Sequence, residues 1–124
     1  MKTFFKQRLI SILNALNGIK EGFKTETHLK IHAAIALGVI LAGVYFKISA
    51  AEWALQSLTI ASVISLELIN TSIERFCDFF HPKKSLQIGK IKDLSAAAVL
   101  IASIASFVIG SIIYLPKLAA MFGF

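Results

Sequence analysis

Charged residues are scarce in this chain of 124 residues. Lys, Arg, Asp and Glu together make up 16% of it, whereas hydrophobic residues make up 56%, and the mean hydropathy is +0.75. A soluble domain of this length needs a largely polar surface, which this composition does not supply. Since a helix needs about 20 apolar residues to cross the hydrocarbon core of a membrane, three crossings would use roughly half of the chain. The composition therefore predicts a single integral-membrane domain over residues 1–124.

Several motifs are also missing. Cys77 is the only cysteine, which excludes an internal disulfide. No G-x-x-x-x-G-K-[ST] phosphate loop occurs, because Gly89-Lys90 lacks both the earlier glycine and the following Ser or Thr. His28 and His32 share one helix face, but no third ligand accompanies them, so we do not expect a zinc site.

The formal net charge is +6, from 13 Lys+Arg against 7 Asp+Glu. The basic residues are not interleaved with aromatic residues or Gly-rich loops, so we expect no nucleic-acid partner and instead contact with anionic lipid headgroups. Eleven of the basic residues cluster before the first expected span and around the connection between the second and third spans. The other two lie on the opposite side of the membrane. The clustered residues are Lys2, Lys6, Arg8, Lys20, Lys24, Lys30, Arg75, Lys83, Lys84, Lys90 and Lys92; the other two are Lys47 and Lys117. This asymmetry predicts a cytoplasmic N-terminus, a cytoplasmic 75–92 loop and a C-terminus outside.

The hydrophobic pattern predicts an all-α membrane protein with four helices. Residues 4–28 have apolar residues at helical spacing and a basic face, which is typical of an amphipathic helix lying on a membrane surface. Packing of this helix on protein is the alternative interpretation. Three transmembrane helices are expected over residues 30–47, 53–80 and 93–115.

Polar residues run down the second half of the second span. Glu67, Asn70, Glu74 and Asp78 are spaced so that all four fall on one stripe of a helix. A carboxylate at membrane depth costs roughly 2.5–3.5 kcal/mol unless it faces protein, water or a cation. Magnesium, which takes oxygen ligands, is the natural partner of several carboxylates. The structural alternative is a polar interface between helices, in which Arg75 or the loop lysines neutralise the acids.

Two further elements lie at the expected cytoplasmic side. Lys92-Asp93 precedes the third span, where Lys92 beside a helix N-terminus would suit an anion and Asp93 would serve as the N-cap. Glu26 lies where the surface helix turns into the first span.

The spacing of these residues resembles a known family. Residues 67–74 (ELINTSIE), Asp78 and residues 92–99 (KDLSAAAV) are similar to the signature of the prokaryotic diacylglycerol kinase and undecaprenol kinase family, and residues 26–32 resemble its first-helix motif. The resemblance covers nearly the whole chain. It departs from the family at His28 and Lys30, where relatives often carry Asn and Arg.

The resemblance implies an ATP- and Mg²⁺-dependent lipid kinase, a homotrimer with active sites at the contacts between protomers. It assigns Glu67 as the general base that takes the proton from the lipid hydroxyl, with Asp78 nearby in the stripe. Glu26 and Glu74 would hold magnesium and also contact ATP. The other residues in contact with ATP would be Asn70, Lys92 and Asp93. Such an enzyme is expected in the bacterial cytoplasmic membrane.

The lipid and the function class stay open at this point. The Glu26 to His32 motif and the His81-Pro82 loop look closer to the undecaprenol-type relatives than to the diacylglycerol-type ones. A small oligomeric transporter would also use intramembrane glutamates, but it would not need Lys92-Asp93 or an amphipathic first helix. A non-catalytic membrane adaptor would need neither the carboxylate stripe nor Glu26.

Overall fold

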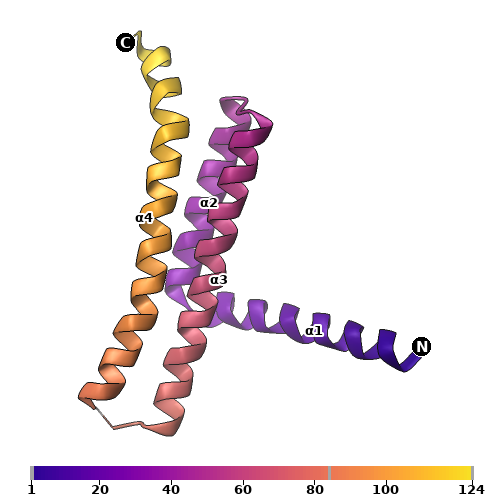
Figure 1. Ribbon diagram of the computed structural model, residues 1–124. Coiled ribbons are helices and arrows are strands. Elements are labelled where there is room, and N and C mark those ends of the chain that lie inside the picture. The colour runs from indigo at the N-terminus through magenta and orange to yellow at the C-terminus, as the bar shows by residue number, and fades with distance from the viewer. Residues whose placement is uncertain (1, 84, 124) are drawn as a thin grey trace.

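The computed structural model describes residues 2–83 and 85–123. These residues form α1 (Lys2–Thr25), α2 (Thr27–Tyr45), α3 (Ala50–Phe80) and α4 (Leu86–Phe122). Figure 1 shows α2, α3 and α4 side by side in a bundle, with α1 leaving it at a steep angle. The prediction of an all-helical chain is confirmed, and α2, α3 and α4 are each long and apolar enough to cross a membrane. Lys84 and the side chain of Lys2, which the charge count includes, lie outside this description.

Most large apolar side chains of the bundle face outward rather than into a core. The residues Leu100, Ile104 and Phe107 of α4 are exposed, and the buried apolar side chains are few. Soluble monomers rarely expose so large an apolar surface to water. It is the arrangement expected where lipid surrounds the helices, because lipid tails are as apolar as the side chains themselves.

The helix boundaries reflect local capping. Helix α3 begins at Ala50 because Ser49 and Glu52 form a capping box: the Ser49 backbone N–H donates to Glu52 Oε2 at 2.7 Å, and the Glu52 N–H donates to Ser49 Oγ at 3.3 Å. At the other end of the chain, α4 runs on through Pro116 and ends against Gly123, whose φ is +80°.

Helix α4 begins much earlier than residue 93. Its N-cap residue is Ser85, and its first residue is Leu86. The interpretation of Asp93 as an N-cap is therefore wrong: Asp93 lies inside the helix and is exposed. Lys92 likewise does not stand beside a helix N-terminus. The reason is that α4, like α3, extends beyond its apolar portion, so the start of the apolar run does not mark the start of the helix.

A tight corner joins α1 to α2, and Glu26 is the single residue between them. Gly22, buried in the last turns of α1, lies against α3: a Cβ atom at this position would stand 2.7 Å from Leu68 Cδ2. Only glycine permits so close an approach without displacing the leucine. This contact fixes where α1 leaves the bundle.

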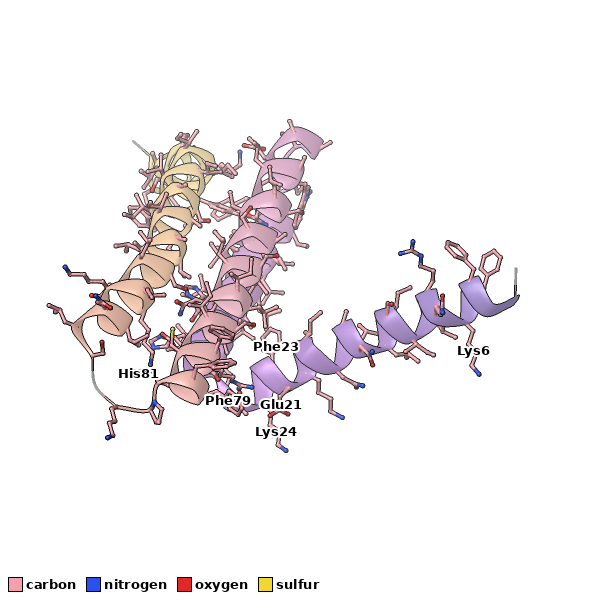
Figure 2. All side chains as sticks on the ribbon, turned by 60° about the horizontal axis from the view of Figure 1, so that its bottom comes forward. Lys6, Glu21, Phe23, Lys24, Phe79 and His81 are labelled. Atoms are coloured by element: carbon pink, nitrogen blue, oxygen red, sulfur yellow. The ribbon has the colours of Figure 1, made fainter. Side chains whose placement is uncertain are left out.

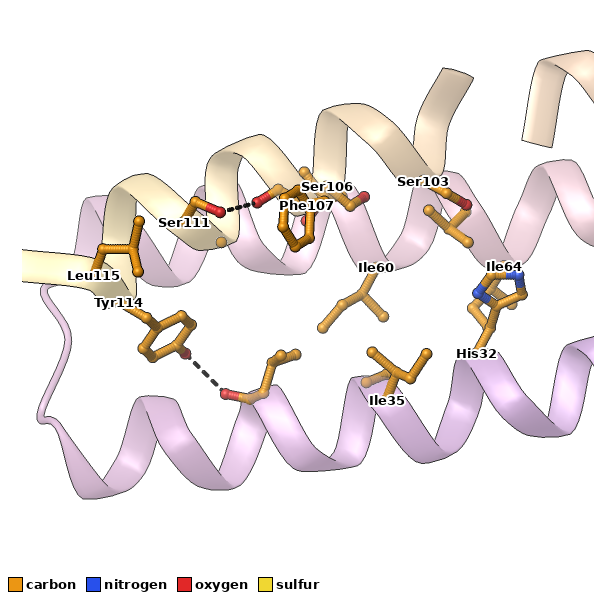
Figure 3. A pocket seen from close by; sticks show the side chains of 15 residues that line it. His32, Ile35, Ile60, Ile64, Ser103, Ser106, Phe107, Ser111, Tyr114 and Leu115 are labelled. Carbon is orange, nitrogen blue, oxygen red and sulfur yellow. Dashed lines mark hydrogen bonds between the residues drawn. The ribbon is translucent and has the colours of Figure 1, made fainter. Parts of the chain in front are cut away.

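At the end of the bundle that holds the α2–α3 turn and the C-terminus, polar contacts join all three helices. Tyr114 Oη donates to the Val39 carbonyl at 2.8 Å and is 2.5 Å from Gln56 Oε1, and Lys117 pairs with Glu52 at 2.7 Å. A groove of about 480 Å³ lies between α2, α3 and α4, and Tyr114 and Val39 are among the residues that line it. Figure 3 shows Tyr114 at one end of this groove, with its hydrogen bond to α2 as a dashed line. We call these contacts the far-end network.

Candidate active site

Two residues of the polar stripe of α3, Asn70 and Asp78, contact α4 toward the end of the bundle opposite the far-end network. Glu67 is buried, with 5% of its surface exposed, and Asn70 and Thr71 are buried beside it. Ser95 Oγ on α4 donates to Asn70 Oδ1 at 2.7 Å, and Asn70 Nδ2 donates to Glu74 Oε1 at 3.3 Å. Asn70 is thereby fixed between the two helices with its amide orientation set by both neighbours.

Glu67 differs from the other acids of the stripe. None of the three ion pairs found within residues 2–83 and 85–123 includes it. A buried carboxylate normally has a cation or several donors beside it. Glu67 is therefore a carboxylate that the chain keeps inside the helix bundle without a basic partner from its described residues.

Lys92 and Asp78 form the next contact along the α3–α4 pair. The Lys92 ammonium lies 2.5 Å from Asp78 Oδ1, with 30% of the lysine side chain and 65% of the aspartate side chain exposed. The pair is thus open to solvent on the aspartate side. Asp93, the next residue of α4, is exposed and takes part in none of the ion pairs of the described residues.

Glu26 is held at the α1–α2 corner by α3. Arg75 Nη2 donates to Glu26 Oε1 at 2.8 Å and also to Thr25 Oγ1, and Thr25 Oγ1 donates to Glu26 Oε1 at 3.0 Å. The hydrogen bond from Arg75 is the main reason that the pKa of Glu26 is lowered from its ordinary value, and the Thr25 hydroxyl acts in the same direction. Glu26 is therefore ionised at neutral pH.

Glu26, Glu74 and Asp78 thus each have a distinct local partner, whereas Glu67 and Asp93 have none among the described residues. Arg75 and Lys92 do neutralise acids, as the structural alternative supposed, but Arg75 pairs with Glu26 rather than with the stripe. Sequence reasoning also assigned no role to Ser95, although its hydroxyl orients Asn70. The signal that could have found it is its place in the KDLSAAAV segment, three residues beyond Lys92.

The donors that the site offers to magnesium are carboxylate oxygens. No group of three or more His, Cys, Asp or Glu side chains comes together within the described part of the chain. The carboxylates nevertheless have oxygens to offer: Glu26 and Glu74 each accept hydrogen bonds through Oε1, and no described residue donates to their Oε2 atoms. Carboxylate oxygens of this kind suit Mg²⁺, which binds through one or two carboxylates together with substrate phosphates rather than in an all-protein cage.

A second cavity, of about 540 Å³, adjoins this region between the end of α3 and the start of α4. Asp78, Lys92 and Asp93 line it together with His81 and Lys90. Figure 2 shows the His81 side chain between the two helix ends. A cavity with several cationic groups and open carboxylates is suited to an anion that carries a divalent cation.

The sequence is similar to known proteins over most of its length. The model of the family described as prokaryotic diacylglycerol kinase matches residues 13–114. The undecaprenol kinase of Bacillus subtilis (strain 168) is 37% identical over 118 residues, which cover 95% of this chain and 93% of that protein. The diacylglycerol kinase of a Synechocystis strain is 33% identical over 114 residues, covering 91% of this chain and 65% of that protein. A diacylglycerol kinase of Helicobacter pylori is 32% identical over 101 residues, covering 78% and 76%.

Proposed function

This chain belongs to the prokaryotic diacylglycerol kinase family, and we propose that it transfers a phosphoryl group from ATP, with magnesium, to the hydroxyl group of undecaprenol. It is a membrane lipid kinase, as its family and its three long apolar helices indicate. The observation that carries the specific proposal is the buried, unpaired Glu67 beside the hydrogen-bonded Asn70, Ser95 and Glu74.

Glu67 has the properties of a general base for a lipid hydroxyl. Phosphoryl transfer depends on positioning and charge neutralisation more than on covalent catalysis, so the protein must supply an acceptor for the hydroxyl proton. Glu67 carries no ion pair from the described residues that would hold its oxygens away from a substrate. Asn70, held by Ser95, would stand next to it toward the nucleotide.

Glu26 and Glu74 would hold magnesium through the carboxylate oxygens that are free of hydrogen bonds from described residues. When bound with ATP, the ion would neutralise charge on the phosphates. The chain's own contribution is to orient both carboxylates. Arg75 does this for Glu26 and the Asn70 amide does it for Glu74.

Lys92 and Asp93 would contact the nucleotide from α4. A lysine ammonium has three donors, and the contact with Asp78 uses one of them, which leaves donors for a phosphate oxygen. The adjoining cavity supports a nucleotide there, since it is open and lined by Lys90 and His81 as well. Asp78 would then act by holding Lys92 in place.

The position of α1 supports a location of this site at the membrane boundary. If α1 lies on the membrane surface, its contact at Leu68 marks the interface on α3. The portion of α3 from Ala50 to Leu68 is about 27 Å long, close to the roughly 30 Å of a hydrocarbon core. Glu67 would then lie at the boundary, and Glu74 and Asp78 would project into the cytoplasm. In Figure 2 Lys6 and Lys24 lie on the side of α1 away from the bundle, which fits a helix whose charged residues face water and headgroups.

The orientation in the membrane is inferred from the basic residues. Figure 1 has the α3–α4 loop at one end of the bundle and the α2–α3 turn with the C-terminus at the other. The excess of Lys and Arg around the first of these ends favours a cytoplasmic location for it. A reporter fused to the C-terminus should lie outside the cytoplasm and one inserted near Pro82 should lie inside; reporters on the same side would refute this orientation.

A homotrimer with shared active sites is part of the proposal. Glu26 and Glu74 have different partners within one chain, and no third acid joins either of them among the described residues. A second protomer can complete such a site. Mixing Glu67→Ala and Glu26→Ala chains should restore part of the activity if one site draws these residues from two protomers, and no restoration at any ratio would exclude sharing.

The similarity to an undecaprenol kinase over almost the full length of both chains supports undecaprenol over diacylglycerol. The test is phosphorylation of each lipid by the purified protein in detergent, with labelled ATP and magnesium. We expect labelled undecaprenyl phosphate at a higher kcat/KM than labelled phosphatidic acid. A preference for diacylglycerol would refute the choice of lipid, and transfer to neither would refute the proposed reaction.

A further inference from the structure

Arg75 reaches across from α3 to the α1–α2 corner, 49 positions away from Glu26 in sequence. Its guanidinium contacts two neighbouring residues there, the Glu26 carboxylate and the Thr25 hydroxyl. Arg75 directly follows Glu74, so the same turn of α3 supplies one proposed magnesium ligand and the arginine that holds the other. Arg75 itself lies outside the segments 26–32, 67–74 and 92–99 that carry the family resemblance.

The contacts are all on one oxygen of the carboxylate. Arg75 and Thr25 both donate to Glu26 Oε1, and no described residue donates to Oε2. Glu26 is at the N-cap position of α2, yet its side chain makes no capping hydrogen bond. The carboxylate is therefore oriented by Arg75 and Thr25, with its second oxygen available.

The ion pair is poorly placed to act as a fastener between helices. The Arg75 side chain is 48% exposed and that of Glu26 is 27% exposed, and ion pairs exposed to solvent contribute little to stability. The corner is already fixed to α3 by the contact of Gly22 with Leu68, which lies two helical turns from Arg75 on the same face. Since the Arg75–Glu26 ion pair adds little to stability, its main effect is to orient the Glu26 carboxylate.

We propose that Arg75, assisted by Thr25, is a positioning residue that turns the Glu26 carboxylate so that Oε2 faces the magnesium ion of the nucleotide. The inference rests on the proposed function, in which Glu26 is a magnesium ligand. Carboxylates that bind metals are commonly hydrogen-bonded through their outer oxygen, and losing such a partner costs about 10–100-fold in metal affinity. Arg75 itself touches neither the metal nor the lipid in this scheme.

If Arg75 instead replaces the metal ion, its removal should change the metal affinity in the opposite direction. If Arg75 merely occupies the place of the cation, removing it would free Glu26 and remove a positive charge, so metal would bind more tightly. If Arg75 positions the carboxylate, removing it weakens metal binding. The sign of the change in affinity therefore decides between the two.

The experiment measures Mn²⁺ binding by electron paramagnetic resonance, with purified full-length protein in detergent and a non-hydrolysable ATP analogue. For Arg75→Gln we expect the Kd of Mn²⁺ to rise by about 10–100-fold. Arg75→Lys, which keeps a charged donor, should recover most of the affinity, and Thr25→Val should show a smaller loss. Lys24→Gln is the matched control, because it removes an exposed positive charge near the same corner, and its Kd should stay within about twofold. An unchanged or lower Kd for Arg75→Gln, or no Mn²⁺ site in the wild type, would overturn the inference.

A double variant separates an effect through Glu26 from a direct one. If Arg75 acts through Glu26, then Arg75→Gln/Glu26→Gln should bind Mn²⁺ no more weakly than Glu26→Gln alone. Additive losses would mean that Arg75 has its own contact with the nucleotide, and would overturn the positioning role. In lipid phosphorylation, Arg75→Gln should raise the magnesium concentration for half-maximal rate while kcat at saturating magnesium changes little. Failure of the Mn²⁺ prediction with phosphorylation intact would refute only this inference; absence of lipid phosphorylation by the wild type would refute the proposed function.

Discussion

The two ends of the α3–α4 pair are built from the same kinds of side chain. At each end a buried amide on α3 meets a hydroxyl on α4: Asn70 with Ser95 at one end, Gln56 with Tyr114 at the other. At each end a lysine of α4 also pairs with a carboxylate of α3, which is Asp78 for Lys92 and Glu52 for Lys117.

The two ends differ in how many of their carboxylate oxygens accept hydrogen bonds. Glu52 accepts from Lys117 through Oε1 and from the Ser49 backbone N–H through Oε2, so both of its oxygens are engaged. At the opposite end, Glu26, Glu74 and Asp78 each accept through one oxygen, and no hydrogen bond to Glu67 is formed by a described residue. We call Glu26, Glu67, Glu74 and Asp78 the open carboxylates.

This difference separates two uses of polar groups in membrane helices. An intramembrane acid is commonly a functional residue, but one whose oxygens are all engaged by the chain serves to hold helices together. The far-end network is of the second kind, since Tyr114 and Lys117 are the residues that join α4 to α2 and α3 there. Under the proposed function the open carboxylates are of the first kind, because they have acceptor sites left for a cation or a substrate proton.

Among the two proposed magnesium ligands, the larger effect is expected for Glu74→Gln. The amide removes an anionic ligand but keeps the size and the contact with Asn70. Because loss of an outer partner already costs about 10–100-fold in metal affinity, loss of a ligand should lower the rate at low magnesium by at least about 100-fold. Assays over a range of magnesium concentrations should show partial rescue, and a rate that stays low at every concentration would remove Glu74 from the metal site.

Replacing Lys117 should lower the stability of the chain, whereas replacing Lys92 should lower its activity. Lys117→Met leaves Glu52 without its cation while both side chains are only about a quarter exposed, so the free energy of unfolding should fall. Lys92→Met leaves Asp78, which is largely exposed, so stability should change little while lipid phosphorylation falls.

Unfolding in sodium dodecyl sulfate followed by circular dichroism measures the first quantity, and labelled-ATP transfer measures the second. The comparison breaks if Lys117→Met abolishes transfer in protein that is still folded, or if Lys92→Met destabilises the chain as much as Lys117→Met does.

The smallest effect is expected where a single hydroxyl is removed. Tyr114→Phe keeps the ring and loses the hydroxyl that donates to the Val39 carbonyl and lies 2.5 Å from Gln56 Oε1. A hydrogen bond of this kind within a membrane contributes about 0.5–1.5 kcal/mol. Its matched partner, Ser95→Ala, removes the hydroxyl that orients Asn70. Turnover should fall in Ser95→Ala and stay near the wild-type value in Tyr114→Phe. The reverse pattern in transfer assays would show that the far end takes part in the reaction.

The helices and the polar stripe could be predicted because their signals are local. The spacing of Glu67, Asn70 and Glu74 is enough to put them on one face of a helix, and the long apolar runs indicate the spans. The start of α4 was missed because the segment from Leu86 to Lys92 mixes glycine and lysines with apolar residues. Such a segment looks like a loop when only hydropathy is considered, although a helix outside the hydrocarbon has no need of an apolar surface.

The partners of the charged residues could not be predicted from the sequence. Glu52 and Lys117 are 65 positions apart, and Arg75 and Glu26 are 49 apart, so only the packing of the helices decides which charges meet. Gln56 was visible as an amide in an apolar segment, but nothing in its surroundings identifies Tyr114 as its partner. Sequence patterns therefore located polar residues and left open which of them hold the fold.

The most direct test compares Glu67→Gln with Glu52→Gln in undecaprenol phosphorylation at saturating magnesium. Both substitutions replace a carboxylate of α3 by an amide of the same shape, one in the open group and one in the far-end network. We predict that Glu67→Gln lowers kcat by about 10²–10⁴-fold, the usual loss for a general base, with no rescue by further magnesium. Glu52→Gln should keep most of its turnover in protein that remains folded, at a lowered stability. Equal losses in the two variants, or a Glu67→Gln enzyme with nearly normal turnover, would contradict the assignment of catalysis to the open carboxylates.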